Sequence, residues 1–329
     1  MTNMPYNEFL NNKISPYNIY QIKTVEDVLE SLKNCGFQGR NLGKALDLLY
    51  HMVSSKNILT VLTLSGAMVP AGMGEIICAL MDHSLIDVIV STGANVIHDL
   101  VDAFTDIGHY VGNTNVDDDK LYKLRINRIY DVFLPEDNYL KTEKEILSII
   151  KNVFQQKTIE ITPSDFLKKL GENINKRCIL SIAAKNNIPI FVPALSDSEL
   201  GLDLIVYSIK EDYEFKFDIF GDVLKFGKLI KKYKEHGTLI IGGGVPRNWA
   251  QQIFPLLDQI EKMKSIGYKY SVRIHTATEY DGGLSGCTIS ESKSWGKYSL
   301  ESKSVSIWCD ATIALPILIT GLFQKLKII

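Results

Sequence analysis

The chain has 329 residues, with 46% hydrophobic side chains, 22% charged side chains and a formal net charge of −2. This length and composition allow a large buried core, built as one large α/β domain or as two smaller ones. Lysine and arginine are dispersed, so nothing indicates a surface for nucleic acid. The five cysteines form no CxxC pair and the six histidines show no metal-ligand spacing. We therefore expect no metal site and a reduced, cytoplasmic setting.

No segment of the chain predicts insertion into a membrane. Residues 1–13 lack an apolar core and a cleavage site, so we expect no signal peptide. Residues 311–323 are apolar, but the run is too short to span a bilayer and Pro316 interrupts it. We expect a buried helix there.

Short apolar runs that predict strands alternate with helical patterns along the chain. A helix is expected to begin near Asn41, and others to cover residues 71–83 and 96–105. The predicted strands are residues 58–63, 87–91, 188–192, 238–241, 270–275 and 305–308. Residues 108–138 are less regular and include the acidic stretch 117–119, which is typical of a functional segment or one packed against a partner.

The predicted strands are nearly continuous in apolar residues, a pattern typical of parallel strands covered on both faces. Together with the strand–helix alternation, it predicts an α/β fold with a Rossmann-like wound, mostly parallel sheet and helices on both faces. No linker or repeat divides the chain. We expect an N-terminal extension over residues 1–25 and a single domain over residues 26–329.

Small-residue loops follow several predicted strands. The strand at 238–241 runs directly into Gly242, Gly243 and Gly244, and Pro246 suits the first turn of a following helix. No GxGxxG pattern follows any predicted strand, so this segment is a tight turn or a cofactor loop. Similar exits at 65–66 and 91–94 would meet it in the crevice at the carboxyl ends of parallel strands.

A lysine stands close to a large aromatic ring near the end of the chain. A turn-rich polar loop over residues 281–290 leads into Trp295, Gly296 and Lys297. Desolvation of an ammonium group lowers its pKa, and a neutral lysine is a covalent nucleophile. The residues alone leave two interpretations open, namely a nucleophile and a surface lysine that follows a buried tryptophan.

Residues 279–297, EYDGGLSGCTISESKSWGK, resemble the catalytic signature of the deoxyhypusine synthase family. The resemblance continues, in the family's order, at residues 35–46, 65–75, 87–100, 126–139, 188–201, 239–246 and 309–316. It implies that Lys297 carries a covalent imine. It also implies a Rossmann-like sheet and a homotetramer, a dimer of dimers with active sites at dimer interfaces.

The resemblance implies an NAD site as well. The residues expected to line it are Gly66, Ala67, Met68, Val69, Pro70, Thr92, Gly93, Ala94, His98, Asp197, Gly243, Thr276, Ala277, Asp310 and Ala311. Asp197 and Asp310 would accept hydrogen bonds from ribose hydroxyls. Each also precedes a helical pattern, so helix capping is the alternative role of both.

The family reaction that the resemblance implies is an NAD-dependent aminoalkyl transfer. A hydride leaves a secondary amine such as spermidine, Lys297 holds the aminobutyl group as an imine, and an acceptor amine then displaces the lysine. The acceptor is a protein lysine, giving deoxyhypusine, or a free diamine such as putrescine, as in homospermidine synthesis. A third reading, from another class, is a non-catalytic subunit that activates a paralogue.

Two side chains near Lys297 suit an amine substrate. Trp295 would supply an apolar or cation–π wall for its chain, and Glu291 would pair with an ammonium group or orient the lysine. Asn248 stands where the family's catalytic histidine is expected, and it can orient a proton or water but cannot act as a general base.

Several acidic positions of eukaryotic members are altered in this chain. Ile97 and His98 replace two adjacent glutamates, and leucines replace aspartates at 202 and 284, although Asp203 stands beside the first. Loss of one partner of a buried cation costs roughly 3–5 kcal/mol, so the donor amine is left open. His98 has three readings: a contact to cofactor or amine, an acid–base group, or a satisfied core residue.

Overall fold

The computed structural model describes residues 10, 12–106, 108–262 and 266–329. Its centre is a six-stranded sheet in the order β11-β10-β9-β1-β2-β7, in which every neighbouring pair is parallel. The strands are β1 (Ile58–Leu64), β2 (Val88–Ser91), β7 (Ile190–Phe191), β9 (Glu235–Ile241), β10 (Tyr268–His275) and β11 (Tyr298–Trp308). The predicted wound, mostly parallel sheet is confirmed.

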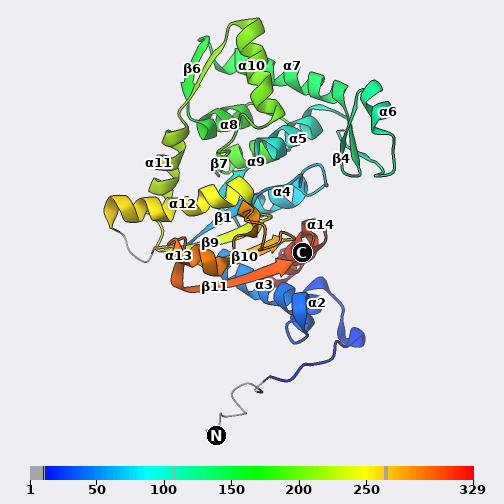
Figure 1. Cartoon of the computed structure of the whole chain (residues 1–329), viewed down its shortest axis with the longest axis vertical. Coiled ribbons are helices and arrows are strands. Elements are labelled where there is room, and N and C mark those ends of the chain that lie inside the picture. Colours follow the sequence, from blue (N-terminus) through cyan, green and yellow to red (C-terminus); the bar gives the residue numbers. More distant parts are fainter. Residues whose placement is uncertain (1–9, 11, 107, 263–265) are drawn as a thin grey trace.

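Helices cover both faces of this sheet (Figure 1). The longer helices are α2 (Val25–Leu32), α3 (Phe37–Ser54), α4 (Gly74–Asp82), α5 (Gly93–Phe104), α7 (Glu136–Val153), α8 (Pro163–Glu172), α10 (Glu199–Glu211), α11 (Ile219–Ile230), α12 (Gly244–Glu261) and α14 (Ala311–Lys325). The shorter ones are α6 (Asp118–Lys123), α9 (Ile179–Lys185), α13 (Ile289–Ser294) and the 3-10 turns η1 (Ile19–Gln21) and η2 (Leu284–Gly286).

Successive side chains of β1 divide between two apolar cores, because side chains alternate across a strand. Leu59 and Val61 face the core that α11 and α12 complete. Leu62 and Leu64 face the other, larger core, to which α3 and α14 contribute. Burial on both faces explains why these strands are continuous in apolar residues.

The predicted strands all form, and most are longer than expected. β11 begins at Tyr298 rather than at residue 305. The early part of this strand was not predicted because its polar residues hide the strand pattern, and its register with β10 shifts between Tyr268 and Tyr270. The 188–192 prediction shortens to the two residues of β7.

Helix starts differ from the expected positions where a capping residue lies elsewhere. α5 begins at Gly93, before residue 96, because the Thr92 side chain accepts a hydrogen bond from the Asn95 amide and caps the helix. The helix expected near Asn41 begins at Phe37, directly after an extended Gly36. The start expected at 71 moves to Gly74.

The irregular segment 108–138 contains a small antiparallel sheet that the pattern did not predict. Its strands are β3 (Tyr110–Val111), β4 (Ile126–Ile129) and β5 (Val132–Pro135). The acidic stretch has a local role, because the Asp117 side chain accepts from the Lys120 amide and two more acids occupy the first turn of α6. A second small sheet, β6 (Thr158–Ile161) with β8 (Glu214–Phe217), was also missed.

The C-terminal apolar run forms α14, which packs its apolar residues into the larger core. Within the described parts of the chain, no helix combines the length and apolar character needed to cross a bilayer.

The chain order of the strands creates a switch point between β1 and β9. From β1 the chain moves outward to β2 and β7, then returns past β1 to build β9, β10 and β11 on the other side. In open α/β sheets, the crevice at the carboxyl ends of strands beside such a reversal is the usual ligand site.

Candidate active site

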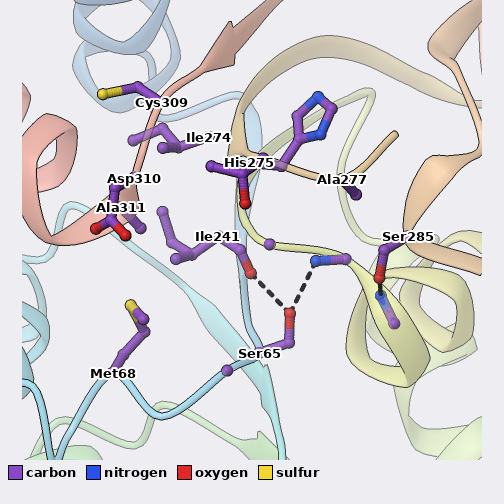
Figure 2. Close-up of a pocket in the computed structure, with 15 residues that line it drawn as sticks. Ser65, Met68, Ile241, Ile274, His275, Ala277, Ser285, Cys309, Asp310 and Ala311 are labelled. Atoms are coloured by element: carbon purple, nitrogen blue, oxygen red, sulfur yellow. Dashed lines mark hydrogen bonds between the residues drawn. The ribbon is translucent and has the colours of Figure 1, made fainter. Parts of the chain in front are cut away.

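A cavity of about 370 Å³ lies at the switch point, at the carboxyl ends of β1, β9, β10 and β11 (Figure 2). It is within the size range of small-molecule sites. Its lining residues are Ser65, Gly66, Met68, Ile241, Gly242, Gly243, Gly244, Ile274, His275, Thr276, Ala277, Ser285, Cys309, Asp310 and Ala311.

The triple glycine forms a tightly held turn on one side of this cavity. Gly242 and Gly244 adopt positive φ angles of 78° and 59°, which favour glycine. The Gly243 amide donates to Ser65 Oγ at 2.8 Å, and the Gly244 amide donates to Ser285 Oγ at 2.9 Å. A Cβ atom on Gly243 would lie 2.9 Å from the Cα of Ser285. The turn therefore brings bare backbone to the cavity wall.

The predicted cofactor residues divide into three groups. Gly66, Met68, Gly243, Thr276, Ala277, Asp310 and Ala311 line the switch-point cavity. Val69 and Pro70 line a neighbouring cavity of about 610 Å³, together with Asp102, His109 and Thr312. Ala67, Thr92, Gly93, Ala94, His98 and Asp197 line neither of these two cavities.

Two residues of the last group have evident structural roles. Thr92 caps α5, as described above. Gly93 lets α5 approach the loop before α10, because a Cβ atom there would meet the Ser198 hydroxyl and the Leu195 carbonyl. These contacts do not depend on any ligand.

The two aspartates with alternative capping roles behave differently. Asp310 caps α14, since its Oδ1 accepts from the amide of Thr312 at 2.7 Å and from its hydroxyl at 2.6 Å. Asp310 also lines the cavity, so capping and ligand contact are compatible. Asp197 does not cap α10; Ser198 does, by accepting from the Gly201 amide.

Lys297 is placed by the end of α13. The Gly296 amide donates to the Lys293 carbonyl and the Lys297 amide donates to the Ser292 carbonyl, the two bonds of a Schellman motif. Gly296 has a φ of 71°, the left-handed conformation that this motif requires. The SWGK sequence thus ends a helix, turns the chain and starts β11 with the lysine side chain in a fixed place.

The Lys297 side chain is buried, with 6% of its surface exposed. Its Nζ atom donates to Asn248 Oδ1 at 2.9 Å and lies 5.8 Å from the centre of the Trp295 ring. Burial lowers the pKa of this lysine, and the charge of Arg247 acts in the same direction. The tryptophan itself is 63% exposed, so the surface-lysine reading had the burial of the two residues reversed.

Glu291 lies on α13 and is exposed. Among the described residues it forms no ion pair with Lys297, although its charge raises the pKa of the lysine and so opposes the effect of burial. The orienting contact to Lys297 comes instead from Asn248, in the second turn of α12.

Two buried arginines, on β10 and α12, were not predicted. Arg273, in β10, donates to the carbonyls of Gly242, Cys287 and Ser285 and so ties the glycine turn to the loop before α13. Arg247, in α12, is 2% exposed and donates to Ser292 Oγ at 3.2 Å. Arginine in a sequence pattern indicates a surface residue, so no local signal identified either one.

His98 lies in α5 and joins a chain of hydrogen bonds. Asp102 Oδ1 lies 2.7 Å from His109 Nδ1, and His109 Nε2 lies 2.9 Å from His98 Nδ1. The Tyr139 hydroxyl is 3.4 Å from His98 Nε2. Because a carboxylate only accepts, neutral rings must donate in one direction, from Tyr139 through His98 and His109 to Asp102.

Burial lowers the pKa of His98 to about 4, and His109 acts in the same direction. Both ring nitrogens have a partner and the side chain is buried. Within a single chain, His98 is therefore a satisfied core residue. Its contact with a ligand stays a prediction.

Asp203, in α10, is 6% exposed. Burial, and to a smaller extent the nearby charges of Glu199 and Glu143, raise its pKa to about 8. Buried carboxyls with raised pKa values are frequent at functional sites, where they hold protons or cations. The neighbouring Leu202 is 55% exposed, so the two residues are not interchangeable here.

The predicted substrate residues form two separate groups within one chain. Lys297, Trp295, Glu291 and Asn248 lie on α12, on α13 and in the turn between α13 and β11. His98 and Asp203 lie on α5 and α10, which pack together near the β7 end of the sheet (Figure 1). No group of His, Cys, Asp or Glu among the described residues has the arrangement of a metal site.

Comparison with known proteins places this arrangement in one family. The family model for deoxyhypusine synthase matches residues 27–322. A Methanosarcina acetivorans protein named "Probable deoxyhypusine synthase 2" is 36% identical over 331 residues, which cover 98% of this chain and 93% of that protein. A Chlorobaculum tepidum protein named "Deoxyhypusine synthase-like protein" is 32% identical, with 92% and 87% covered.

A solved structure agrees in fold. The Entamoeba histolytica protein assigned as a deoxyhypusine synthase superposes with a TM-score of 0.65 at 20% identity, covering 94% of this chain and 97% of that one. With a family model that spans most of the sequence and relatives above 30% identity, the chain belongs to the deoxyhypusine synthase family.

Proposed function

We propose that this protein is an NAD-dependent aminoalkyl transferase that carries the transferred group as an imine on Lys297. Family membership supports a transferase. The observation that carries the finer proposal is the Lys297 side chain itself, which is buried, hydrogen-bonded to Asn248 and held with a lowered pKa. A lysine that is neutral near physiological pH can attack an imine carbon.

The switch-point cavity suits NAD. Its glycine turn carries no side chain of its own, so a phosphate could come close to the backbone there, beside the Ser65 and Ser285 hydroxyls that bond the Gly243 and Gly244 amides. Asp310 uses Oδ1 to cap α14, which leaves Oδ2 free to accept from a ribose hydroxyl. When bound, NAD would accept a hydride from the donor amine and return it to the final imine.

Lys297 performs the covalent steps in this proposal. Its neutral amine adds to the carbon of the donor imine, the carbon–nitrogen bond to the leaving amine breaks, and the lysine proton passes to that amine. The acceptor amine later adds to the same carbon and expels Lys297 in the same way. Asn248 accepts a hydrogen bond from Nζ and so aims the amine. Trp295 shields one side of the transferred chain from water.

The second group of predicted substrate residues, His98 and Asp203, would take part in the reaction through the assembly of several chains. We propose that a homotetramer brings the α5 and α10 surface of one chain to the Lys297 region of another. His98 and Asp203 would then contact the distal part of the substrate. Among these, Asp203 is the one group suited to hold an ammonium, because pairing with a cation would favour its ionised form.

The acceptor amine is the least constrained part of the proposal. A protein lysine fits the family reaction. The exposed Leu202 and Leu284, where eukaryotic members have acids, remove charges that would hold a long polyamine and favour testing a free diamine as well.

The test is borohydride trapping with NAD, one amine at a time, and candidate acceptors, read by peptide mass. The panel contains spermidine, homospermidine, putrescine and agmatine. We expect an NAD-dependent aminoalkyl addition on Lys297, absent from Lys297→Ala, while that variant keeps its melting temperature and NAD affinity. Trapping at another residue in the alanine variant would overturn the role of Lys297. Measurable NAD binding with no trapping by any amine would favour the non-catalytic subunit.

A further inference from the structure

Arg247 is a buried cation with open hydrogen-bonding capacity. It lies in α12, one residue before Asn248, and its side chain is 2% exposed. Its Nη2 donates to Ser292 Oγ at 3.2 Å. Its Nε and Nη1 atoms are buried and have no hydrogen-bond partner among the described residues. Most buried guanidinium groups are paired with a carboxylate, so this arrangement calls for an explanation.

Lys297 and Arg247 share the same surroundings. The Lys297 amide donates to the Ser292 carbonyl at 3.2 Å, while Arg247 binds the Ser292 hydroxyl. The lysine Nζ bonds Asn248, the residue next to Arg247 in the chain. Within the described residues, no ion pair involves either Lys297 or Arg247.

Two cationic side chains that are shielded from water differ in how readily each loses its proton. An arginine keeps its proton under all ordinary conditions, whereas a buried lysine gives its proton up readily. The like charge of Arg247 therefore acts on the one group of the pair that can become neutral. A neutral amine is also the form that a nucleophilic lysine needs.

We propose that Arg247 is a positioning residue that keeps Lys297 in its neutral, nucleophilic form by placing a permanent, unpaired positive charge beside it. The proposal deepens the function proposed above, because it rests on Lys297 as the nucleophile. It assigns Arg247 no contact with substrate or cofactor.

The other charged groups near Lys297 oppose the effect of Arg247. Burial is the largest cause of the lowered pKa of Lys297. An ionised Cys287 raises the pKa and comes next in size, Arg247 then lowers it, and Glu291 raises it with the smallest effect. Cys287 precedes α13 and its Sγ lies 3.3 Å from Ser292 Oγ. Glu291 is exposed on α13, so solvent screens its charge more than that of the buried arginine.

The test measures the titration of Lys297 without any substrate. Cyanate carbamoylates only neutral amines, so its rate at each lysine, read by peptide mass across a pH series, reports the neutral fraction. Lys303, exposed in β11, serves as the internal reference in the same sample. The variants are R247Q, which removes the charge, R247K, which replaces the permanent charge by one that a buried lysine can lose, and E291Q, which removes an opposing charge.

We expect the Lys297 midpoint in the unaltered protein to lie below that of Lys303. R247Q should move it to higher pH, with a several-fold loss of Lys297 labelling at neutral pH. R247K should move it less than R247Q does, and E291Q should lower it further. If Arg247 had a purely structural role, its substitution would change folding, and the Lys297 midpoint would be the same in R247Q and R247K.

Two outcomes would overturn the proposal. One is a Lys297 midpoint that equals that of Lys303 in the unaltered protein, a comparison that needs no variant to fold. The other is a folded R247Q with an unchanged Lys297 midpoint. Failure of the proposed function would give a different result. No imine would form with any amine, but the labelling of Lys297 would still depend on Arg247.

Discussion

Lys297 and Asn248 are 49 residues apart in sequence, and the lysine Nζ donates a hydrogen bond to the asparagine Oδ1 at 2.9 Å. The contact joins the turn after α13 to the second turn of α12, just beyond the glycine turn that borders the switch-point cavity. A neutral acceptor orients the amine without favouring its charged form as strongly as a carboxylate would.

This relationship predicts the effect of Asn248→Asp. The new carboxylate has the same size but carries a charge, so it should pair with Lys297 and favour the protonated lysine. We expect imine formation at neutral pH to slow by roughly tenfold or more, which corresponds to about 1.4 kcal/mol in the barrier. Single-turnover trapping across a pH series should show the rate recovering at high pH.

The control is Asn248→Gln, which keeps a neutral acceptor and displaces it by one methylene. It should lower the rate without moving the pH profile. An Asn248→Asp profile identical to that of the unaltered protein would contradict a direct influence of this residue on the lysine.

Gly243→Ala should weaken NAD binding. The added Cβ would lie 2.9 Å from the Cα of Ser285, so the turn and its hydrogen bonds must shift at the cavity wall. We expect NAD affinity to fall by about tenfold or more, about 1.4 kcal/mol, as measured by calorimetry. Gly36→Ala is the matched control, since a Cβ there has open space around it. Equal NAD affinity in both variants would place the cofactor elsewhere.

His98 should make the protein less stable in mild acid. Its pKa is about 4 in the folded chain and near 6.5 when unfolded, so between these values the unfolded chain binds the extra proton. The free energy of unfolding should therefore fall as pH decreases from 6.5 to 4, with this residue contributing at most about 1.4 kcal/mol per pH unit.

Urea unfolding at several pH values checks this contribution. His98→Asn loses hydrogen bonds at every pH, but its stability should depend less steeply on pH across that window. An unchanged slope would mean that His98 titrates normally in the folded protein.

Asp203 should have the opposite dependence. Its folded pKa of about 8 exceeds the usual value of 3.8, so the folded chain binds the extra proton between these values and stability is lost as pH rises. Asp203→Asn should stabilise the protein by an amount that grows with pH up to about 8, on the order of a few kcal/mol, and nearly vanishes below pH 4.

Thermal melting of both proteins across this pH range is the measurement. Asp197→Asn, just before α10, is the control for loss of an acidic side chain near Asp203. If a bound amine restores the stability of unaltered protein at high pH but not that of Asp203→Asn, Asp203 holds the ammonium group. A pH-independent difference would contradict the raised pKa.

Local patterns in the sequence were sufficient for the central sheet. Apart from β11, the parallel strands are largely buried on both faces, which makes their sequences rich in apolar residues, and this signal is independent of which helix covers them. The glycines at 242–244 and the SWGK turn could also be interpreted locally, because positive φ angles restrict the residue type. The small sheets at 110–135 and around β6 and β8 were missed, since their strands are short and partly exposed.

The sequence by itself determined the family, the wound parallel sheet and the identity of the candidate nucleophile, because these depend on residue order and local conformation. Only the tertiary structure decided the surroundings of that nucleophile. Arg247 and Asn248 lie near Lys297 because the first turns of α12 pack beside the end of α13. Burial also separates the Arg247 charge from water, and no carboxylate among the described residues pairs with it. Charges interact through space, so electrostatic neighbours become visible only when segments distant in sequence are brought together.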